Sequence, residues 1–356
     1  MRKRLMALLQ LALGVGLITF LFYRMDNKTD LLEALRAIAS HPLYLTGAIF
    51  SFFACMLMCA WRWKLILSAH DIQLPFWKAM ELFLIGQFFN AFMFGSVGGD
   101  LVKVFFVAKA IPHKQTEAVA TVFIDRLMGL LSLIILIAVI MGLRYPFFMR
   151  YPQTRIFMIF MTGVLIATVG GLFLIFRKNV FEHWAFFRHL EERTPLGKMI
   201  SKTYNAFHTC LRHKGLLFST LTISMANHIS IIIAALLLGL GLNIRTVHPT
   251  PEPDNALAES VALSPLGIIK EFGNYLTVFP IINGISAIPA TPGGLGTREA
   301  AAEFLLGVPE FDVPSTRAIP LSLLLYATTL FWSLIGGGVY SLHSIRPKAL
   351  AKPLKQ

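Results

Sequence analysis

The stretch "SVGGDLVK", residues 96–103, interrupts a strongly apolar region of the sequence. It places two adjacent glycines, an aspartate and a lysine directly after the apolar run "FFNAFMF" at 88–94. Glycine permits a sharp turn because it has no Cβ, and aspartate is a favoured helix N-cap. Lys103 follows Asp100 by about one helical turn and lies on nearly the same face. The stretch therefore predicts a break in an apolar segment, followed by a short helix with charges on one side.

The composition indicates a membrane protein. Of 356 residues, 56% are hydrophobic and 14% are charged, and the mean hydropathy is +0.66. A helix needs about 20 apolar residues to cross a hydrocarbon core of about 30 Å. Six stretches meet that length: Leu5–Tyr23, Pro42–Trp61, Ala118–Leu143, Ile156–Phe176, Leu216–Leu242 and Ile319–His343. We expect an all-α polytopic membrane protein with a single transmembrane domain over residues 1–356.

A second glycine-rich break resembles the first. In "TPGGLGTREAAAE", residues 291–303, the segment Pro292–Gly296 forms the break, Thr297 is the expected cap, and Arg298 and Glu299 occupy the first helical turn. The regions Phe76–Ala110 and Val261–Leu306 each have a long apolar arm, the break and an arm of about ten residues. Such an arm extends only about 15 Å, half of the hydrocarbon core. We therefore predict two re-entrant helical hairpins.

The distribution of charge suggests how the chain is threaded. The net charge of +13 arises from basic residues beside apolar runs, which favours orienting signals over nucleic-acid binding. If both termini are cytoplasmic, most Lys and Arg residues lie on the cytoplasmic side of the membrane. The segment "RYPFFMRYPQTR" at 144–155 is the exception, because it is basic but lies on the outer side. The resulting halves, 1–143 and 144–345, form an inverted repeat with hairpins entering from opposite sides. The basic loop 177–215 is either an amphipathic helix on the cytoplasmic leaflet or a solvated connector.

The charged residues at the breaks suggest an anion site. Irregular backbone at membrane depth survives only beside protein or a wet cavity, and helix N-termini attract anions. In this hypothesis Lys103, Arg126 and Arg298 hold a lipid phosphate, while Asp100 and Glu299 gate the site or balance its charge; the alternative is that the acids only cap and pair. The substrate-binding candidates are Gly98, Gly99, Asp100, Lys103, Arg126, Gly293, Gly294, Arg298 and Glu299, and the secondary candidates are Arg62, Asn90, Asp125 and Lys270.

Several of these residues leave alternatives open. Asp125 and Arg126 point about 100° apart on a helix, so they are expected to serve different neighbours. Arg126 either reaches the first hairpin or extends to the interface. Arg62, in "WRWK" at 61–64, is expected at the interface, in contact with lipid headgroups. Lys270 and its neighbour Glu271 cannot both face one partner.

Signals for enzymes are weak. The sequence has no G-x-S-x-G, P-loop or H-E-x-x-H motif, and its three cysteines form no metal-binding pattern. We expect no catalytic residue, no metal and no cofactor.

Three motifs together resemble a known family. The Gly-Gly-Asp break with its following basic residue, "DRLMG" at 125–129 and above all "PATPGGLGTREAA" at 289–301 resemble the lysylphosphatidylglycerol synthase transmembrane region, a flippase-like family of bacteria and archaea. The resemblance extends over Leu5–Arg346 and implies movement of modified phospholipids between leaflets. Lys103 stands where arginine is expected in many relatives. Some members carry an aminoacyl-transferase domain; this chain stops at Gln356 without one, so we expect no synthase activity.

The residues and the resemblance together favour a lipid translocator of the bacterial inner membrane, in which the lipid moves between leaflets through a midplane cavity formed by the two re-entrant hairpins. Its substrate would be a phospholipid or a polyprenyl-phosphate lipid, because related membrane regions also accompany glycosyltransferases. A lipid synthase or glycosyltransferase is the expected protein partner. Two alternatives remain at this stage: a membrane-embedded lipid-modifying transferase, and a non-catalytic partner subunit of a lipid synthase or glycosyltransferase.

Overall fold

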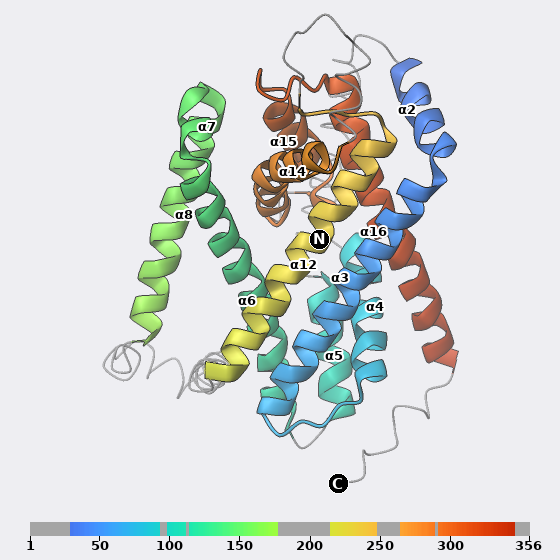
Figure 1. Cartoon of the computed structure of the whole chain (residues 1–356). Helices are drawn as coiled ribbons and strands as arrows, with labels where there is room; N and C mark the ends of the chain where they lie inside the picture. The colour runs from blue at the N-terminus through green and yellow to red at the C-terminus, as the bar shows by residue number, and fades with distance from the viewer. Residues whose placement is uncertain are drawn as a thin grey trace, which may run out of the picture.

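The computed structural model describes residues 29–92, 98–111, 114–176, 214–247, 264–288 and 291–345, which form a helical bundle (Figure 1). Five helices are long and apolar enough to cross a membrane: α3 (Pro42–Ala69), α6 (Gln115–Leu143), α8 (Pro152–Phe176), α12 (Lys214–Gly241) and α16 (Ser315–Ile345). They correspond to five of the predicted spans, and the predicted span Leu5–Tyr23 lies outside the described residues. The prediction of an all-helical, multi-pass membrane protein is confirmed for the described part of the chain.

The first glycine-rich region forms a pair of packed helices. α4 (Phe76–Phe92) packs against α5 (Gly98–Ala110), and the residues between them lie outside the described part. The 13 residues of α5 give it a length of about 20 Å. Gly98 and Gly99 already belong to α5, so Asp100 lies within the first turn and is not the N-cap that the sequence suggested.

The second glycine-rich region has the predicted break and short arm. α14 (Pro265–Ser286) is followed by the 3₁₀ turn η2 (Pro292–Gly294) and by α15 (Thr297–Leu306), whose 10 residues extend about 15 Å. The prediction of Thr297 as the cap is wrong, because the N-cap residue is Gly296. Its φ of 82° lies in the left-handed region, which glycine adopts without strain. Thr297 Oγ1 instead donates to the Gly294 carbonyl over 2.9 Å.

The two helical hairpins lie toward opposite ends of the bundle. Figure 1 shows α4 and α5 in its lower half and α14 and α15 in its upper half. The hairpins also meet, because η2 contacts α4. α6 packs against both α5 and α14, so this one helix contacts both hairpins. The inverted halves 1–143 and 144–345 remain a prediction.

Two shorter helices complete the described chain. α2 (Thr29–Ser40) packs against α3, α12 and α16, and α7 (Tyr145–Arg150) lies within the segment that broke the charge rule. Of the expected basic loop 177–215, only the last two residues are described, and they begin α12.

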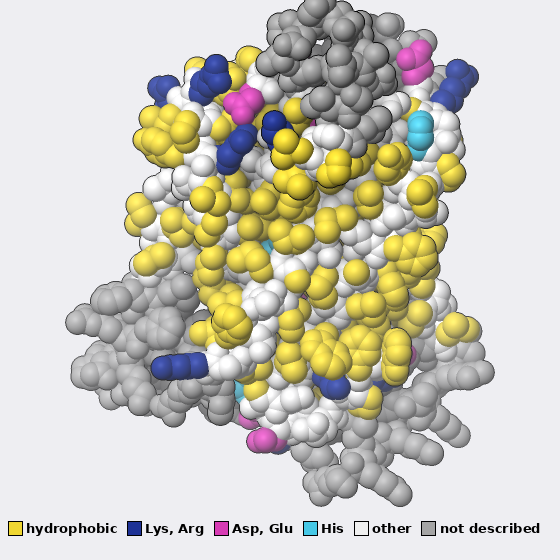
Figure 2. Space-filling view, viewed as in Figure 1, with side chains coloured by type: hydrophobic (Ala, Val, Ile, Leu, Met, Phe, Trp, Pro, Cys, Tyr) yellow, Lys and Arg dark blue, Asp and Glu magenta, His cyan; other side chains and the backbone are white. Residues whose placement is uncertain are grey.

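Each hairpin has its own apolar core. The larger core joins α6, α8, α12 and α16 to the second hairpin and includes Phe148, Phe279 and Phe311. A smaller core packs α3 and α6 against the first hairpin around Trp63 and Leu82. Figure 2 shows apolar side chains over the middle of the visible face, with basic side chains near its two ends. This pattern is typical of a protein whose solvent is lipid in the middle and water at the ends.

Candidate functional site

In the first hairpin, the backbones of α4 and α5 are in direct contact. A Cβ added to Gly99 would overlap the carbonyl oxygen of Gly86 and the side chain of Asn90. Asn90 Oδ1 accepts a hydrogen bond from the Gly99 amide over 2.7 Å. Glycine at 99 is therefore required by the packing of α5 on α4. Asn90 satisfies one of the free N–H groups at the start of α5, which is a structural task.

Three predicted site residues meet beside this contact. Arg126 on α6 donates from Nη1 to Asp100 Oδ2, and Lys103 Nζ lies 3.5 Å from Asp100 Oδ1. The Lys103 ammonium is also 4.1 Å from the ring centroid of Phe83, and the residue is only 6% exposed. Asp100 thus balances two cations on the first hairpin and α6. Arg126 reaches the first hairpin, as the first of the two alternatives proposed.

Asp125 serves a different neighbour from Arg126, as the 100° spacing predicted. Its Oδ1 accepts from Arg62 Nε over 2.7 Å, and Arg62 Nη1 donates to Ser224 Oγ over 2.7 Å. Arg62 and Asp125 are 5% and 7% exposed. Arg62 therefore lies inside the bundle between α3, α6 and α12, and not at the headgroups as the "WRWK" motif suggested. The physical reason is its buried acidic partner, since an unpaired guanidinium would be expelled toward water.

In the second hairpin, a glutamate stabilises the glycine-rich break by accepting hydrogen bonds. Glu299, fully buried, accepts from the Gly296 amide over 2.6 Å and from Ser322 Oγ over 3.1 Å. Gly293 and Gly294 adopt φ values of 60° and 71°, so the chain turns sharply there. The carboxylate thereby occupies the start of α15, where an anion would otherwise be favoured.

Among the predicted site residues that the structure describes, Arg298 is the one with a buried side-chain nitrogen that lacks a hydrogen-bond partner. Its Nε lies 3.4 Å from Glu299 Oε1, and its guanidinium carbon stands 4.7 Å from the ring centroid of Tyr326 on α16. Nη2 is buried and has no hydrogen-bond partner among the described residues. A buried guanidinium N–H without an acceptor is costly, so this atom marks a place for an anionic or polar group.

Apart from the Arg62–Asp125 pair, the structure brings the predicted residues together as two sets. Asn90, Gly99, Asp100, Lys103 and Arg126 gather at the first hairpin, whereas Gly293, Gly294, Arg298 and Glu299 gather at the second. Lys270 belongs to neither set, because it is exposed on α14.

Glu271, the neighbour of Lys270, is buried and has a role that the sequence did not reveal. Its carboxylate accepts from the Thr246 amide over 2.9 Å and from Thr246 Oγ1 over 2.5 Å. Asn274, one turn later, donates to Thr246 Oγ1 over 3.1 Å. α14 therefore anchors the segment that follows α12. The one sequence signal for this anchoring role was the 100° angle between adjacent helical residues, which turns Glu271 away from Lys270.

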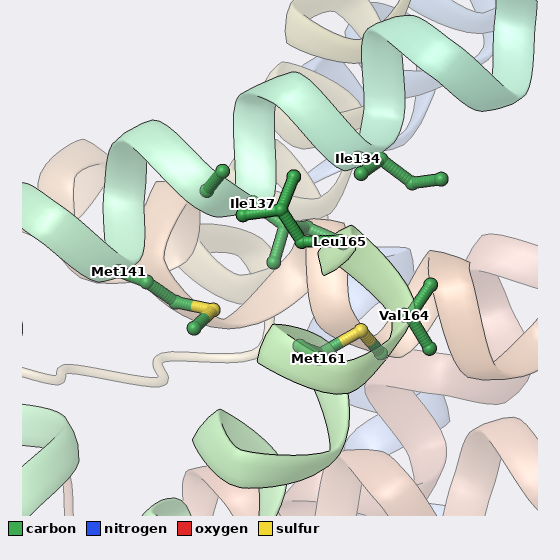
Figure 3. A pocket seen from close by; sticks show the side chains of 7 residues that line it. Ile134, Ile137, Met141, Met161, Val164 and Leu165 are labelled. Carbon is green, nitrogen blue, oxygen red and sulfur yellow. The ribbon is translucent and has the colours of Figure 1, made fainter. Parts of the chain in front are cut away.

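Two cavities lie away from both sets. A small groove of about 10 Å³ between α6 and α8 is lined only by apolar side chains, among them Ile137, Met141 and Met161 (Figure 3). A larger space of about 390 Å³ is bordered by Glu33 on α2 and Arg317 on α16. Within the described ranges, no group of three His, Cys, Asp or Glu side chains could hold a metal ion.

Comparisons with known proteins agree with the helical membrane architecture. The family model described as the lysylphosphatidylglycerol synthase TM region matches residues 7–249. A relative, the UPF0104 membrane protein PH1989 of Pyrococcus horikoshii, is 29% identical over 129 residues, which make up 36% of this chain and 38% of the relative. This chain thus spans well under half of that relative's length. No solved structure matches.

The family match contains the whole first hairpin, the Arg62–Asp125 pair and Arg126. It ends before "PGGLGTRE" at 292–299, so the second hairpin rests on the motif and the geometry. Because the match covers most of the sequence, the chain belongs to the lysylphosphatidylglycerol synthase transmembrane-region family.

Proposed function

We propose that this protein is a lipid translocator of the bacterial inner membrane that moves an anionic or phosphate-linked lipid between leaflets. In this proposal both termini are cytoplasmic, the two hairpins enter the bilayer from opposite sides, and the lipid phosphate interacts with Lys103, Arg126 and Arg298. The observation that carries the proposal is Arg298, a buried cation with a free N–H group at a break between two helices. A buried charge of this kind is expensive in a membrane protein, and such residues mark substrate pathways.

The first hairpin supports the same substrate chemistry in another way. Lys103 and Arg126 converge on the carboxylate of Asp100, an anion supplied by the protein itself. A phosphate group has the charge and the acceptor oxygens to replace that carboxylate. Asp100 would then hold the two cations in place until a lipid headgroup arrives. Its proposed role is to balance charge in the empty site.

Glu299 takes a supporting role in this proposal. Its carboxylate is engaged by the Gly296 amide and by Ser322, so it fixes the direction of the first turn of α15. That turn carries Arg298. The position of the Arg298 guanidinium, between Glu299 and the Tyr326 ring, follows from this arrangement.

The test is leaflet exchange in proteoliposomes. Purified protein is reconstituted with phosphatidylglycerol labelled on an acyl chain, and dithionite quenching reports the fraction of label that reaches the outer leaflet. We expect the exchange rate of Arg298→Gln to fall about 10- to 100-fold, since hydrogen bonds to charged groups contribute about 1.5–3 kcal/mol. Arg150→Gln is the matched control, because Arg150 is exposed at the end of α7.

Each outcome decides between the alternatives. Equal exchange by wild type and Arg298→Gln would refute the assigned role. A wild-type protein that catalyses no exchange, but forms a covalent lipid product with a donor, would indicate the transferase. Activity only in the presence of a co-purified synthase or glycosyltransferase would indicate the partner subunit.

A further inference from the structure

The polar groups between α3, α6 and α12 form a cluster that the proposed lipid site does not use. On α12, Ser224 accepts from Arg62, and His228 lies one turn further along the same face. On α6, Asp125 binds Arg62, while Gly129 and Ser132 contact His228. His228 is 8% exposed. The cluster thus places an imidazole in the interior of a membrane protein, beside a buried ion pair.

The hydrogen bonds of His228 determine which ring nitrogen carries the hydrogen. Nε2 lies 3.2 Å from the carbonyl oxygen of Gly129 and 3.1 Å from Ser132 Oγ. A carbonyl oxygen only accepts, and the Ser132 hydroxyl already donates to that same carbonyl over 2.8 Å. Both neighbours therefore require Nε2 to be the donor. In the neutral ring, Nδ1 is then the bare nitrogen with a lone pair.

Nδ1 is buried and has no hydrogen-bond partner among the described residues. A buried basic nitrogen without a donor is an open acceptor for a proton. Proton uptake there forms one N–H bond, leaves the Nε2 bond in place and changes the ring from neutral to a single positive charge. The proton comes from a hydronium ion, whose O–H bond breaks as the N–H bond forms and which leaves as neutral water.

The His228 ring lies near the Arg62 guanidinium, and the residue that it contacts on α6 is one turn from Arg126 of the proposed lipid site. Gly129, whose carbonyl accepts from His228, lies one turn after Arg126 on α6. A Cβ on Gly129 would lie 3.3 Å from Arg62 Nη1, so the Arg62 guanidinium and the His228 ring contact the same residue. Among the described residues, the ionisable groups at this cluster include Arg62, Cys55 and Cys59 on α3 and Asp125 on α6, and Lys103 on α5 acts on Cys59. Tyr275 on α14 approaches Gly239 of α12, about three turns beyond His228.

We propose that His228 is a proton-binding site and that its proton binds together with the lipid anion. An imidazolium beside Arg62 adds positive charge that the single carboxylate of Asp125 does not balance. An anionic headgroup at Arg126 supplies the missing negative charge, so the proton and the anion favour each other's binding. By linkage this coupling acts equally in both directions. The link to lipid movement rests on the proposed function, whereas proton binding at Nδ1 does not.

Proton binding is measured without transport. Protein labelled with ¹⁵N-histidine is reconstituted in liposomes, and solid-state NMR distinguishes a bare ring nitrogen from a protonated one. We expect the His228 signal, assigned by its absence in His228→Gln, to change from a bare to a protonated Nδ1 as the pH is lowered from about 8 to about 5. A signal that stays bare over that range would overturn the proposal. If the glutamine variant does not fold, Ser132→Ala assigns the signal instead, since His228 is the histidine that Ser132 contacts among the described residues.

Coupling is measured by exchange of labelled phosphatidylglycerol at different pH values. Wild-type exchange should rise as the pH falls, by up to about tenfold per pH unit, the limit for one proton. His228→Gln keeps a donor near Nε2 but has no base at Nδ1, so its exchange should be independent of pH. His41→Gln removes an exposed histidine and should behave like wild type. A pH dependence retained in His228→Gln would contradict coupling. Absence of exchange in wild type at every pH would instead contradict the proposed function, and the NMR result would still decide proton binding.

Discussion

Gly99 on α5 lies so close to Gly86 on α4 that a single added methyl group would overlap the Gly86 carbonyl oxygen. The two arms of the first hairpin are therefore in backbone contact. This contact positions Asp100 and Lys103, which follow Gly99 within one turn, next to Arg126.

Gly99→Ala should therefore destabilise the protein. We expect a loss of about 1–3 kcal/mol, because overpacking a dense interior forces the backbone apart. The measurement is thermal unfolding in detergent. Gly142→Ala is the matched control, because a Cβ there meets nothing within 4 Å, and helical Gly→Ala is otherwise favourable. Equal melting temperatures for the two variants would show that the hairpin opens without strain.

Removal of either partner of the Arg62–Asp125 pair should strongly destabilise the protein. Asp125→Asn leaves a buried guanidinium without its counter-charge, for which we expect a loss of about 3–5 kcal/mol. Arg62→Met combined with Asp125→Asn should lose less than the sum of the single variants, because no unpaired charge remains. Unfolding of the four proteins in a double-mutant cycle measures the difference.

The pair Lys78–Glu81 on the surface of α4 is the control for that cycle. Its ammonium and carboxylate are 2.7 Å apart, and both side chains are about a quarter exposed. Lys78→Gln should change stability by no more than about 1 kcal/mol. A similar small effect at Asp125 would mean that Arg62 is solvated in the membrane.

Glu299 should act on stability through the start of α15. Glu299→Ala leaves the Gly296 amide and the Ser322 hydroxyl without their acceptor, which should cost about 1–3 kcal/mol. Glu303→Ala, on the same helix, is the control, because the Glu303 side chain makes no hydrogen bond within the described part of the chain. Circular dichroism during heating compares the two. If Glu299 has no structural task, both variants melt together.

The Arg144–Glu310 pair should contribute modestly. Arg144 Nη2 donates to Glu310 Oε1 over 2.9 Å, and the side chains are 38% and 28% exposed. Because solvent screens such a pair, we expect a coupling energy of about 0.2–1 kcal/mol. The double-mutant cycle of Arg144→Gln and Glu310→Gln gives this number, and increasing salt should reduce it.

Much of the fold could be predicted because its signals are local. Long apolar runs marked α3, α6, α8, α12 and α16, and the glycine pairs marked both helical hairpins. The 100° spacing correctly separated the partners of Asp125 and Arg126. These inferences need only neighbouring residues.

The predictions that were wrong or missing depend on distant residues or on backbone angles. The prediction that Arg62 lies at the interface was wrong, because its partners Asp125 and Ser224 are 63 and 162 positions away and could not be recognised from the local sequence. Gly296 was overlooked as a cap, because its left-handed φ follows from the tight turn beginning at Pro292. The anchoring of Thr246 by Glu271 likewise joins two separate parts of the chain.

Two arginines tie α6 to its neighbours: Arg126, in the first half of the helix, contacts Asp100 of the first hairpin, and the C-cap residue Arg144 contacts Asn274 and Glu310 near the second. Eighteen residues separate them, which corresponds to about 27 Å along a helix. A tilt of α6 at one hairpin must therefore either move the other hairpin or break the interactions of Arg126 or Arg144. The two ends of the molecule are mechanically joined even though they face opposite sides of the bundle.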